Sequence, residues 1–275
     1  DGTTTRTIAL TADDVAAGKL VTTGWPLPAD TKTLTVTATL KDAAGNTTPQ
    51  ATDSATLDVT APSNADVNLS IEINTDTNNN SWVSASELAG ANNFVSHVMF
   101  NNKAIAGDRI VFTVTNGGSA LPSLTHILTQ KDITDGFLDM SFDKPAEGGV
   151  QKVTVNYVDA AGNAAGAPAP SDSATLDTTA AGVGIASSKS PTDHLNVLTF
   201  SVNEAGGSYT LHIGTRSFTN IPTAADLTGL GKIPSNEIWM DYVDAAGNPS
   251  TREYLALDTS LVTVDQDTAI SVLYV

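Results

Sequence analysis

The chain of 275 residues contains no cysteine. This absence excludes a disulfide framework, which is the usual stabiliser of small secreted modules. A β-rich protein without disulfides needs another source of stability, and a bound metal ion is one such source. A ligand that binds only the folded state stabilises that state by mass action. The absence of cysteine therefore directs attention to side chains that bind metal.

Positive charge is also scarce. The chain has 13 Lys and Arg residues against 30 Asp and Glu residues, which gives a net charge of −17. Nucleic-acid binding requires a basic face, so we expect no nucleic-acid partner. Asp outnumbers Glu 24 to 6, and aspartate favours turns and binds hard cations. Acidic charge also keeps a secreted protein soluble, and the composition allows both roles.

Long apolar runs and catalytic motifs are missing as well. No run approaches the roughly 18 residues of a membrane span, so we expect no membrane insertion. The sequence contains no Gly-x-Ser-x-Gly motif. The four histidines have no zinc-like spacing, and the carboxylates are too numerous to single out a catalytic pair. We therefore expect no enzyme. Hydrophobic residues nevertheless make up 40 % of the chain, which is enough for packed cores.

Residues 76–87 fit a twelve-residue calcium loop, with oxygen donors at positions 1, 3, 5 and 9 and a glutamate at position 12. Position 6, where the backbone turns sharply, is Ser81 instead of the usual Gly. Two charged ligands place the expected affinity toward the weak, extracellular end of the range. An Asn-rich surface turn is the alternative interpretation. The expected Ca²⁺ ligands are Asp76, Asn78, Asn80, the Trp82 carbonyl, Ser84 and Glu87.

The pentapeptide Asp-Ala-Ala-Gly-Asn occurs three times, beginning at Asp42, Asp159 and Asp244. Each copy is followed by a Leu-Asp pair that ends in Asp58, Asp177 or Asp258. Such specific repetition indicates a tandem array of modules. The pentapeptide by itself is explained as a turn, capped by Asp and closed by a left-handed Gly. An aspartate at a module's exit and one in a nearby turn could also meet at one junctional cation.

Alternating Thr- and Val-rich segments predict short strands at 33–39, 67–73, 109–115, 152–157 and 196–202. Single capped helical turns are predicted at 11–18, 129–136 and 84–88. Many short strands with almost no helix predict an all-β fold of tandem β-sandwiches in an elongated array.

The repeat divides the chain into a partial module of later strands (1–60), a module with the calcium loop (61–178), a shorter module (179–259) and a tail or the start of a further module (260–275). Residues 1–60 hold only half of a sandwich, which leaves an edge unpaired. We therefore expect either that upstream residues belong to this module or that another segment or molecule covers the edge.

These repeats, their junctions and the Asp-Thr-Asn-Asn-Asn loop resemble the bacterial immunoglobulin-like repeats of giant secreted adhesins, of the type I-secreted, non-fimbrial and RTX kinds, such as the giant adhesin of Salmonella. The resemblance covers the first two modules and is thinner in the third, where Ala-Pro is lost at Ala181 and Leu261. It implies an extracellular stalk on the bacterial surface, stiffened by calcium at and between domains, that holds an adhesive tip away from the cell. It places junctional roles on the six repeated aspartates, Asp42, Asp58, Asp159, Asp177, Asp244 and Asp258.

Two functions from different classes remain open. The first is a non-catalytic stalk whose partners are the neighbouring immunoglobulin-like modules. The second is a tip-proximal binding module, in which the divergent third module contacts a host-cell or surface glycan receptor around residues 209–218 or Trp239.

Overall fold

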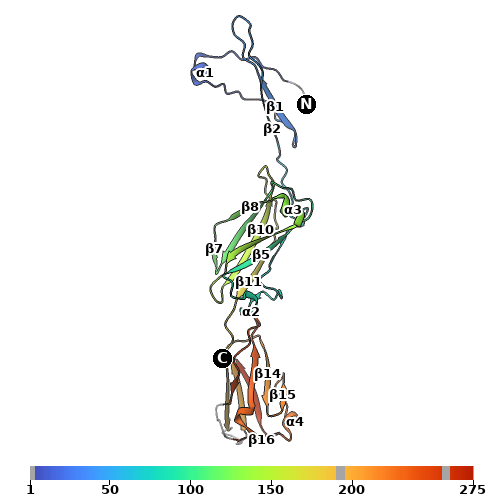
Figure 1. Ribbon diagram of the computed structural model, residues 1–275, viewed down its shortest axis with the longest axis vertical. Helices are drawn as coiled ribbons and strands as arrows, with labels where there is room; N and C mark the ends of the chain where they lie inside the picture. Colours follow the sequence, from blue (N-terminus) through green and yellow to red (C-terminus); the bar gives the residue numbers. More distant parts are fainter. Residues whose placement is uncertain (1–3, 190–195, 256–260, 275) are drawn as a thin grey trace.

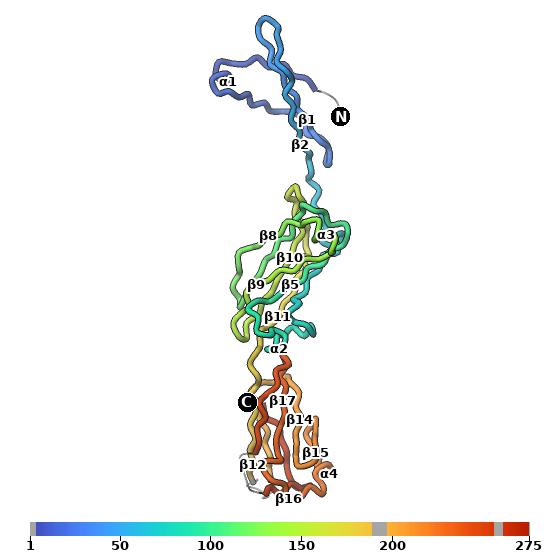
Figure 2. Tube along the Cα trace, viewed as in Figure 1, coloured from blue at the N-terminus to red at the C-terminus, as the bar shows by residue number. Residues whose placement is uncertain are grey.

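The chain forms an elongated array of three units in line (Figures 1 and 2). The computed structural model describes residues 4–189, 196–255 and 261–274. Almost all of its regular structure is short β-strands, and its α-helices have at most six residues. Within the described ranges, no helix has the length and apolarity that crossing a membrane requires. The predicted all-β, tandem fold is confirmed.

Module 1 (residues 4–60) is a single antiparallel hairpin with a short helix beside it. Strand β1 (Thr33–Ala38) pairs with β2 (Ala51–Thr56). Helix α1 (Ala12–Ala17) begins at a capping box between Thr11 and Asp14 and ends at Gly18, whose φ of 61° is left-handed. None of the residues described in module 1 is buried.

Module 2 (residues 61–178) is an immunoglobulin-like β-sandwich. One sheet contains β3 (Ser70–Ile73), β5 (Asn93–Met99) and β9 (Phe137–Asp143). The other has the order β4-β11-β10-β6-β7, with β8 also pairing with β6. Its strands are β4 (Trp82–Val83), β6 (Arg109–Asn116), β7 (Ser119–Ala120), β8 (Leu124–Ile127), β10 (Val150–Val158) and β11 (Ser171–Leu176). The helices are α2 (Ala85–Leu88) and α3 (Gln130–Asp135).

The core of module 2 follows from period-two alternation. Along β6, Ile110, Phe112 and Val114 are buried, and along β10 Val153 and Val155 have no exposed surface. The register places Val153 opposite Val114 and Val155 opposite Phe112, so the apolar side chains of the two strands share one face. Each fully buried side chain of this size contributes about 1.5–3 kcal/mol to stability.

Module 3 (residues 179–274) is a second sandwich of the same kind. Its sheets are β12-β13-β20, β15-β14-β17-β18 and β16-β19. The strands are β12 (Val183–Lys189), β13 (Asn196–Val202), β14 (Ser208–Ile213), β15 (Arg216–Phe218), β16 (Gly231–Pro234), β17 (Ile238–Val243), β18 (Glu253–Tyr254), β19 (Leu261–Val264) and β20 (Ala269–Tyr274). Helix α4 (Ala224–Leu227) and the 3₁₀ turn η1 (Ser235–Glu237) complete the module.

The last residues of the chain belong to module 3, which corrects the prediction that residues 260–275 begin a further module or form a tail. Strand β20 pairs in parallel with β13, and β19 pairs antiparallel with β16. The alternating Ile270 and Val272 pack against the module 3 core. The sandwich therefore needs this segment to cover its core, although the segment follows the third Leu-Asp pair.

Candidate metal centre

The three pentapeptides form the same turn. In each, the Gly N–H donates to the carbonyl of the Asp, with φ near 100° at Gly45, Gly162 and Gly247. The Asn backbone N–H donates to Oδ1 of the Asp at 2.8 Å in all three copies. The Asn side-chain Nδ2 donates to Oδ2 at 2.8, 2.9 and 3.1 Å. The turn thus fixes the carboxylate and the amide as one rigid unit, as its sequence predicts.

A turn and an exit aspartate of the same module lie at opposite ends of a hairpin. Asp42 follows the end of β1, whereas Asp58 lies beyond Thr56, which pairs with Thr33 at the start of β1. At about 3.3 Å per residue, a six-residue strand separates the two by roughly 20 Å. The same topology separates Asp159 from Asp177. Two aspartates of one module therefore cannot share an ion.

The structure instead brings the exit of one module to the turn of the next. Asn163 Nδ2 of module 2 donates to the Asp58 carbonyl at 3.2 Å. Asn248 Nδ2 of module 3 donates to the Asp177 carbonyl at 2.9 Å. Both junctions are the narrow connections between units in Figure 1. Asp42 lies at the far end of module 1, and Asp258 falls outside the described residues.

At the second junction, three carboxylates from two modules converge. Ligand oxygens of Asp177, Glu204 and Asp244 all lie within 4.8 Å of one another. Asp177 follows β11, Glu204 follows β13 and Asp244 follows β17. Asp177 and Asp244 are buried, with 8 % and 4 % of their surface exposed. Across the ranges that the structure describes, this is the one group of three or more acidic or histidine side chains close enough to hold a metal ion.

Glu204 escaped the sequence analysis because it lies outside the repeated motifs. Its loop is held by Tyr242, whose hydroxyl donates to the Glu204 carbonyl at 2.7 Å and accepts from Gly207 N at 3.0 Å. A Cβ at Gly207 would lie 2.2 Å from the Val243 carbonyl, so only glycine allows this close approach. The available signal was a glutamate two residues after the end of β13, with Gly206 and Gly207 shortly after it.

The carboxylates of this cluster destabilise one another when ionised. Burial raises the pKa of Asp177, and the charges of Asp244 and Glu147 raise it further. Burial also raises the pKa of Glu204, followed by the charges of Asp177 and Asp244. Glu147 also lies beside Asp177, and its Oε1 accepts from Thr178 N at 2.6 Å. A cation at the cluster would relieve the repulsion.

The loop 76–87 is folded around its first aspartate. Asp76 has 7 % of its surface exposed. Its Oδ1 accepts from Asn80 N at 3.1 Å and its Oδ2 from Ser81 N at 2.7 Å. Asn78 Oδ1 also accepts from Asn80 N, at 3.0 Å. Ser81 has a φ of 69°, which is the left-handed turn expected at position 6.

Glu87 closes this loop from its far end. Its Oε1 accepts from Thr77 Oγ1 at 3.1 Å and from Asn78 N at 3.3 Å. Its Oε2 accepts from Ser84 N at 3.0 Å, which completes a capping box at the start of α2. Burial disfavours ionised Glu87, but the hydrogen bonds from Ser84 and Thr77 outweigh it and lower the pKa. Helix capping explains the hydrogen bond between Ser84 and Glu87. It does not explain the bonds that Glu87 accepts from Thr77 and Asn78, at positions 2 and 3 of the loop.

The loop is tied directly to the carboxylate cluster. Asn248 Oδ1 accepts from Ala85 N, the first residue of α2, at 2.9 Å. The parallel pairing of β4 with β11 adds Asp177 N donating to the Val83 carbonyl at 3.0 Å. Trp82 also lies in β4, and its backbone N–H donates to Asn80 Oδ1 at 2.8 Å. The predicted loop and the carboxylate cluster therefore share one junction, and Asn248 is hydrogen-bonded to both.

The first junction has a different carboxylate arrangement. The Asp159 carboxylate accepts from Gly162 N and from both Asn163 donors. Asp108 lies between β5 and β6 of module 2, which is the connection equivalent to the one that carries Glu204 between β13 and β14 of module 3. Its side chain points into module 2 and is buried. It accepts from the Tyr157 hydroxyl and from Ala160 N. Asp58 and Asp159 consequently have no third carboxylate gathered with them in the described part of the chain.

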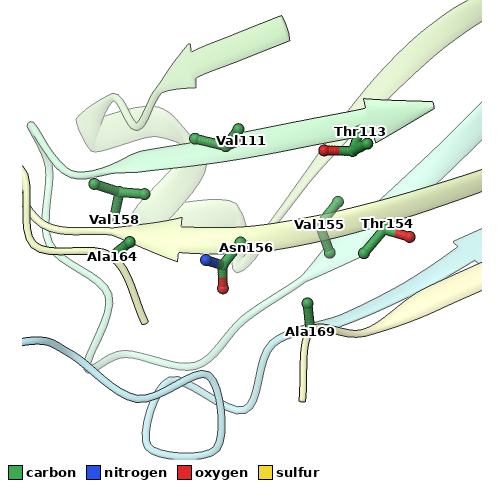
Figure 3. A pocket seen from close by; sticks show the side chains of 8 residues that line it. All are labelled: Val111, Thr113, Thr154, Val155, Asn156, Val158, Ala164 and Ala169. Atoms are coloured by element: carbon green, nitrogen blue, oxygen red, sulfur yellow. The ribbon is translucent and has the colours of Figure 1, made fainter. Parts of the chain in front are cut away.

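Two other features provide no comparable site. The Trp239 ring stacks on His212 at 4.5 Å, and the Arg252 guanidinium lies 5.1 Å from its centroid, so its neighbours in the sheet already engage it. A shallow pocket of about 300 Å³ lies on the β6–β10 face of module 2 (Figure 3). Its lining has no charged side chain, and its amide, Asn156, is bonded to Asn64 and the Ala165 carbonyl.

No protein-family model matches the sequence, and no curated protein matches it. Among solved structures, the chain is similar to BcpA, the major pilin subunit of Bacillus cereus, at 9 % sequence identity and a TM-score of 0.21. The match covers 66 % of this chain and 63 % of the pilin. A likeness this weak carries no argument about function, which must come from the junction itself.

Proposed function

We propose that this chain is a non-catalytic stalk segment of a large bacterial surface adhesin, in which Ca²⁺ fixes one module against the next. The observation that carries the proposal is the meeting of Asp177 from module 2 with Glu204 and Asp244 from module 3. A cation held there would replace repulsion across the junction with attraction.

The chemistry of the donors selects the cation. All three side chains offer carboxylate oxygens, and the loop 76–87 offers carboxylate, amide, hydroxyl and carbonyl oxygens. Oxygen-only donor sets suit hard cations, and flexible sets of six or more suit Ca²⁺ rather than Mg²⁺. Neither group contains the imidazole or thiolate that favours zinc. The residues present therefore fit calcium.

The arrangement of the modules supports the stalk function. A chain of sandwiches in line serves as a spacer, and its bending stiffness depends on the short connections. The sequence resemblance to giant secreted adhesins supports the same assignment and an extracellular location at the bacterial surface. Extracellular calcium is abundant enough for sites with dissociation constants of about 10⁻⁴ to 10⁻³ M.

Calcium titration of the whole chain by calorimetry, with magnesium as the comparison, tests the proposal. We expect at least two bound calcium ions per chain, one at the loop and one at the second junction, and weaker binding of magnesium. Thermal melting of modules 2 and 3 should shift upward with calcium relative to chelator. A chain that binds no calcium at millimolar concentration would contradict the proposal.

A further inference from the structure

The linker that leaves module 2 is bound by a carboxylate of module 2 itself. Glu147 Oε1 accepts from the backbone N–H groups of Thr178 and Thr179, at 2.6 and 3.1 Å. Glu147 Oε2 accepts from Thr178 Oγ1 at 2.8 Å. Hydrogen bonds to an ionised acceptor are stronger than those between neutral groups. One side chain therefore holds both residues that follow Asp177.

The linker that leaves module 1 is bound in the same way by Asp30. Its Oδ1 accepts from Val59 N at 2.8 Å, and its Oδ2 accepts from the Thr60 hydroxyl. Val59 directly follows Asp58, as Thr178 directly follows the exit aspartate of module 2. The corresponding exit of module 3 lies outside the described residues. Both exits that the structure describes therefore have this contact.

The backbone beside the two carboxylates has the same geometry, although the sequences differ. The residue after each carboxylate is left-handed, with a φ of 60° at Thr31 and 72° at Gly148. The N–H of this residue donates to the carbonyl of the module's last leucine, at 2.7 Å from Thr31 to Leu57 and at 2.8 Å from Gly148 to Leu176. A β-branched residue rarely adopts a left-handed conformation. Two different sequences thus place a carboxylate at the same point beside the linker.

The linker donors favour the ionised form of both carboxylates. The hydrogen bonds from Thr60 and Val59 lower the pKa of Asp30. Burial disfavours ionised Glu147, but the hydrogen bonds from its linker outweigh it and lower the pKa. The negative charge is thus stabilised by donors of the chain itself, and the contact needs no cation.

We propose that Asp30 and Glu147 are positioning residues that fix each linker on the module it leaves, with or without calcium. We call this contact the linker latch: one carboxylate of a module bound to the two residues after the exit aspartate of that module. The latch orders the linker, whereas the position of the next module depends on the contacts across the junction. It is a feature of both junctions, although three carboxylates gather only at the second within the described chain.

At the second junction, the latch also constrains the carboxylate that is proposed to bind calcium. The N–H of Thr179 is shared between Glu147 Oε1 and Asp177 Oδ1, at 3.1 and 3.2 Å. Loss of Glu147 should let Asp177 move away from Glu204 and Asp244 and weaken calcium binding there. This second effect rests on the proposed function, whereas the latch itself does not.

Amide hydrogen exchange of the whole chain in chelator, followed by NMR, tests the latch. We expect the N–H groups of Val59 and Thr178 to be protected in the wild type. Glu147→Ala should speed the exchange of Thr178 at least tenfold and leave that of Val59 unchanged, and Asp30→Ala should do the reverse. Each variant is thus the control for the other. Exchange of the Val153 amide, in β10, checks that the sandwich of module 2 stays folded.

Glu147→Gln separates the hydrogen bond from the charge. It removes the charge but keeps an acceptor for Thr178 N, so it should retain protection that Glu147→Ala loses. Unprotected Thr178 and Val59 in the wild type would overturn the proposal. Equal exchange of Thr178 in the wild type and in Glu147→Ala would overturn it as well.

Calcium titration by calorimetry tests the effect on Asp177. Glu147→Ala should bind calcium at the second junction at least threefold more weakly than Glu147→Gln, because both lack the charge and only the former lacks the latch. Asp30→Ala should bind calcium as the wild type does. Equal affinity in the two Glu147 variants would overturn the effect on Asp177. A wild type that binds no calcium would contradict the proposed function, and the exchange rates in chelator would still decide whether the latch exists.

Discussion

At the scale of single residues, the oxygen atoms of the loop that are proposed to bind calcium also have a folding role. Asp76 stabilises the turn at Asn80 and Ser81, and Glu87 caps α2. Sequence spacing predicted the loop and its left-handed position 6. It also predicted a capped turn at 84–88, but it did not show that Ser84 and Glu87 would form that cap with the same oxygens that are proposed to bind calcium.

The first prediction separates these two roles. Glu87→Gln keeps a side chain that can accept the Ser84 hydrogen bonds but removes one of the loop's two negative charges. We expect calorimetry to show one calcium ion fewer per chain. In chelator, the free energy of unfolding should fall by less than about 1 kcal/mol. Glu72→Gln, on an exposed residue of β3, is the matched control and should bind as wild type. Unchanged stoichiometry in Glu87→Gln would leave the loop as an Asn-rich turn.

The second prediction uses the raised pKa values of Asp177 and Glu204. A group whose pKa is higher in the folded state binds more protons there, so its unfavourable contribution appears as pH rises through the folded pKa. Without metal, Glu204→Gln should therefore melt above wild type at pH 7, and the difference should vanish toward pH 4. With calcium, Glu204→Gln should melt below wild type. Its affinity for calcium at the second junction should be at least tenfold weaker, about 1.4 kcal/mol. Lower melting of Glu204→Gln in both chelator and calcium would contradict this.

At the scale of elements, the pentapeptide turn was predictable and its partner was not. Asp, two alanines, Gly and Asn specify the turn locally, whatever surrounds it. Which carboxylates meet at its tip depends on the antiparallel path of β10 and β11, which places the turn of one module at the exit of the previous one. Glu204 approaches through Tyr242 and Gly207, contacts between segments far apart in sequence. The fourth helix, α4, was not predicted, although it has the same Thr-x-x-Asp capping box as α1 and α3 and could have been recognised.

The third prediction concerns the coupling of loop and junction through Asn248. Its side chain accepts from Ala85 and donates to the Asp177 carbonyl and to Asp244. Asn248→Ala removes these bonds, one of them to the Asp244 carboxylate, and leaves all three carboxylates of the cluster in the sequence. With Asn248 present, we expect Glu87→Gln to weaken calcium binding at the junction as well as at the loop. With Asn248→Ala, we expect calcium binding at the two places to become independent. Asn163→Ala, the equivalent change at the first junction, should leave the coupling intact. A double-mutant cycle from calorimetry measures it.

At the scale of the whole molecule, the two junctions differ in how calcium can act on them. The repeated aspartates predicted a junctional cation at both, and the loss of Ala-Pro at Ala181 favoured a less rigid second junction. The structure gathers three carboxylates at the second junction, while at the first Asp108 has turned inward to Tyr157. Repeats of similar sequence therefore build unequal junctions, because the third carboxylate, Glu204, comes from a loop that the repeat does not include.

The last prediction follows from that inequality. Small-angle scattering of the whole chain should show an elongated particle in calcium and, in chelator, a smaller mean dimension with the profile of a flexible array, because repulsion at the second junction separates modules 2 and 3. Glu204→Gln in calcium should shift partly toward the chelated profile. Asp58→Asn, at the junction without a third carboxylate, should change the profile less. A particle equally extended and stiff with and without calcium would show that the junctional aspartates act only as turn and linker residues.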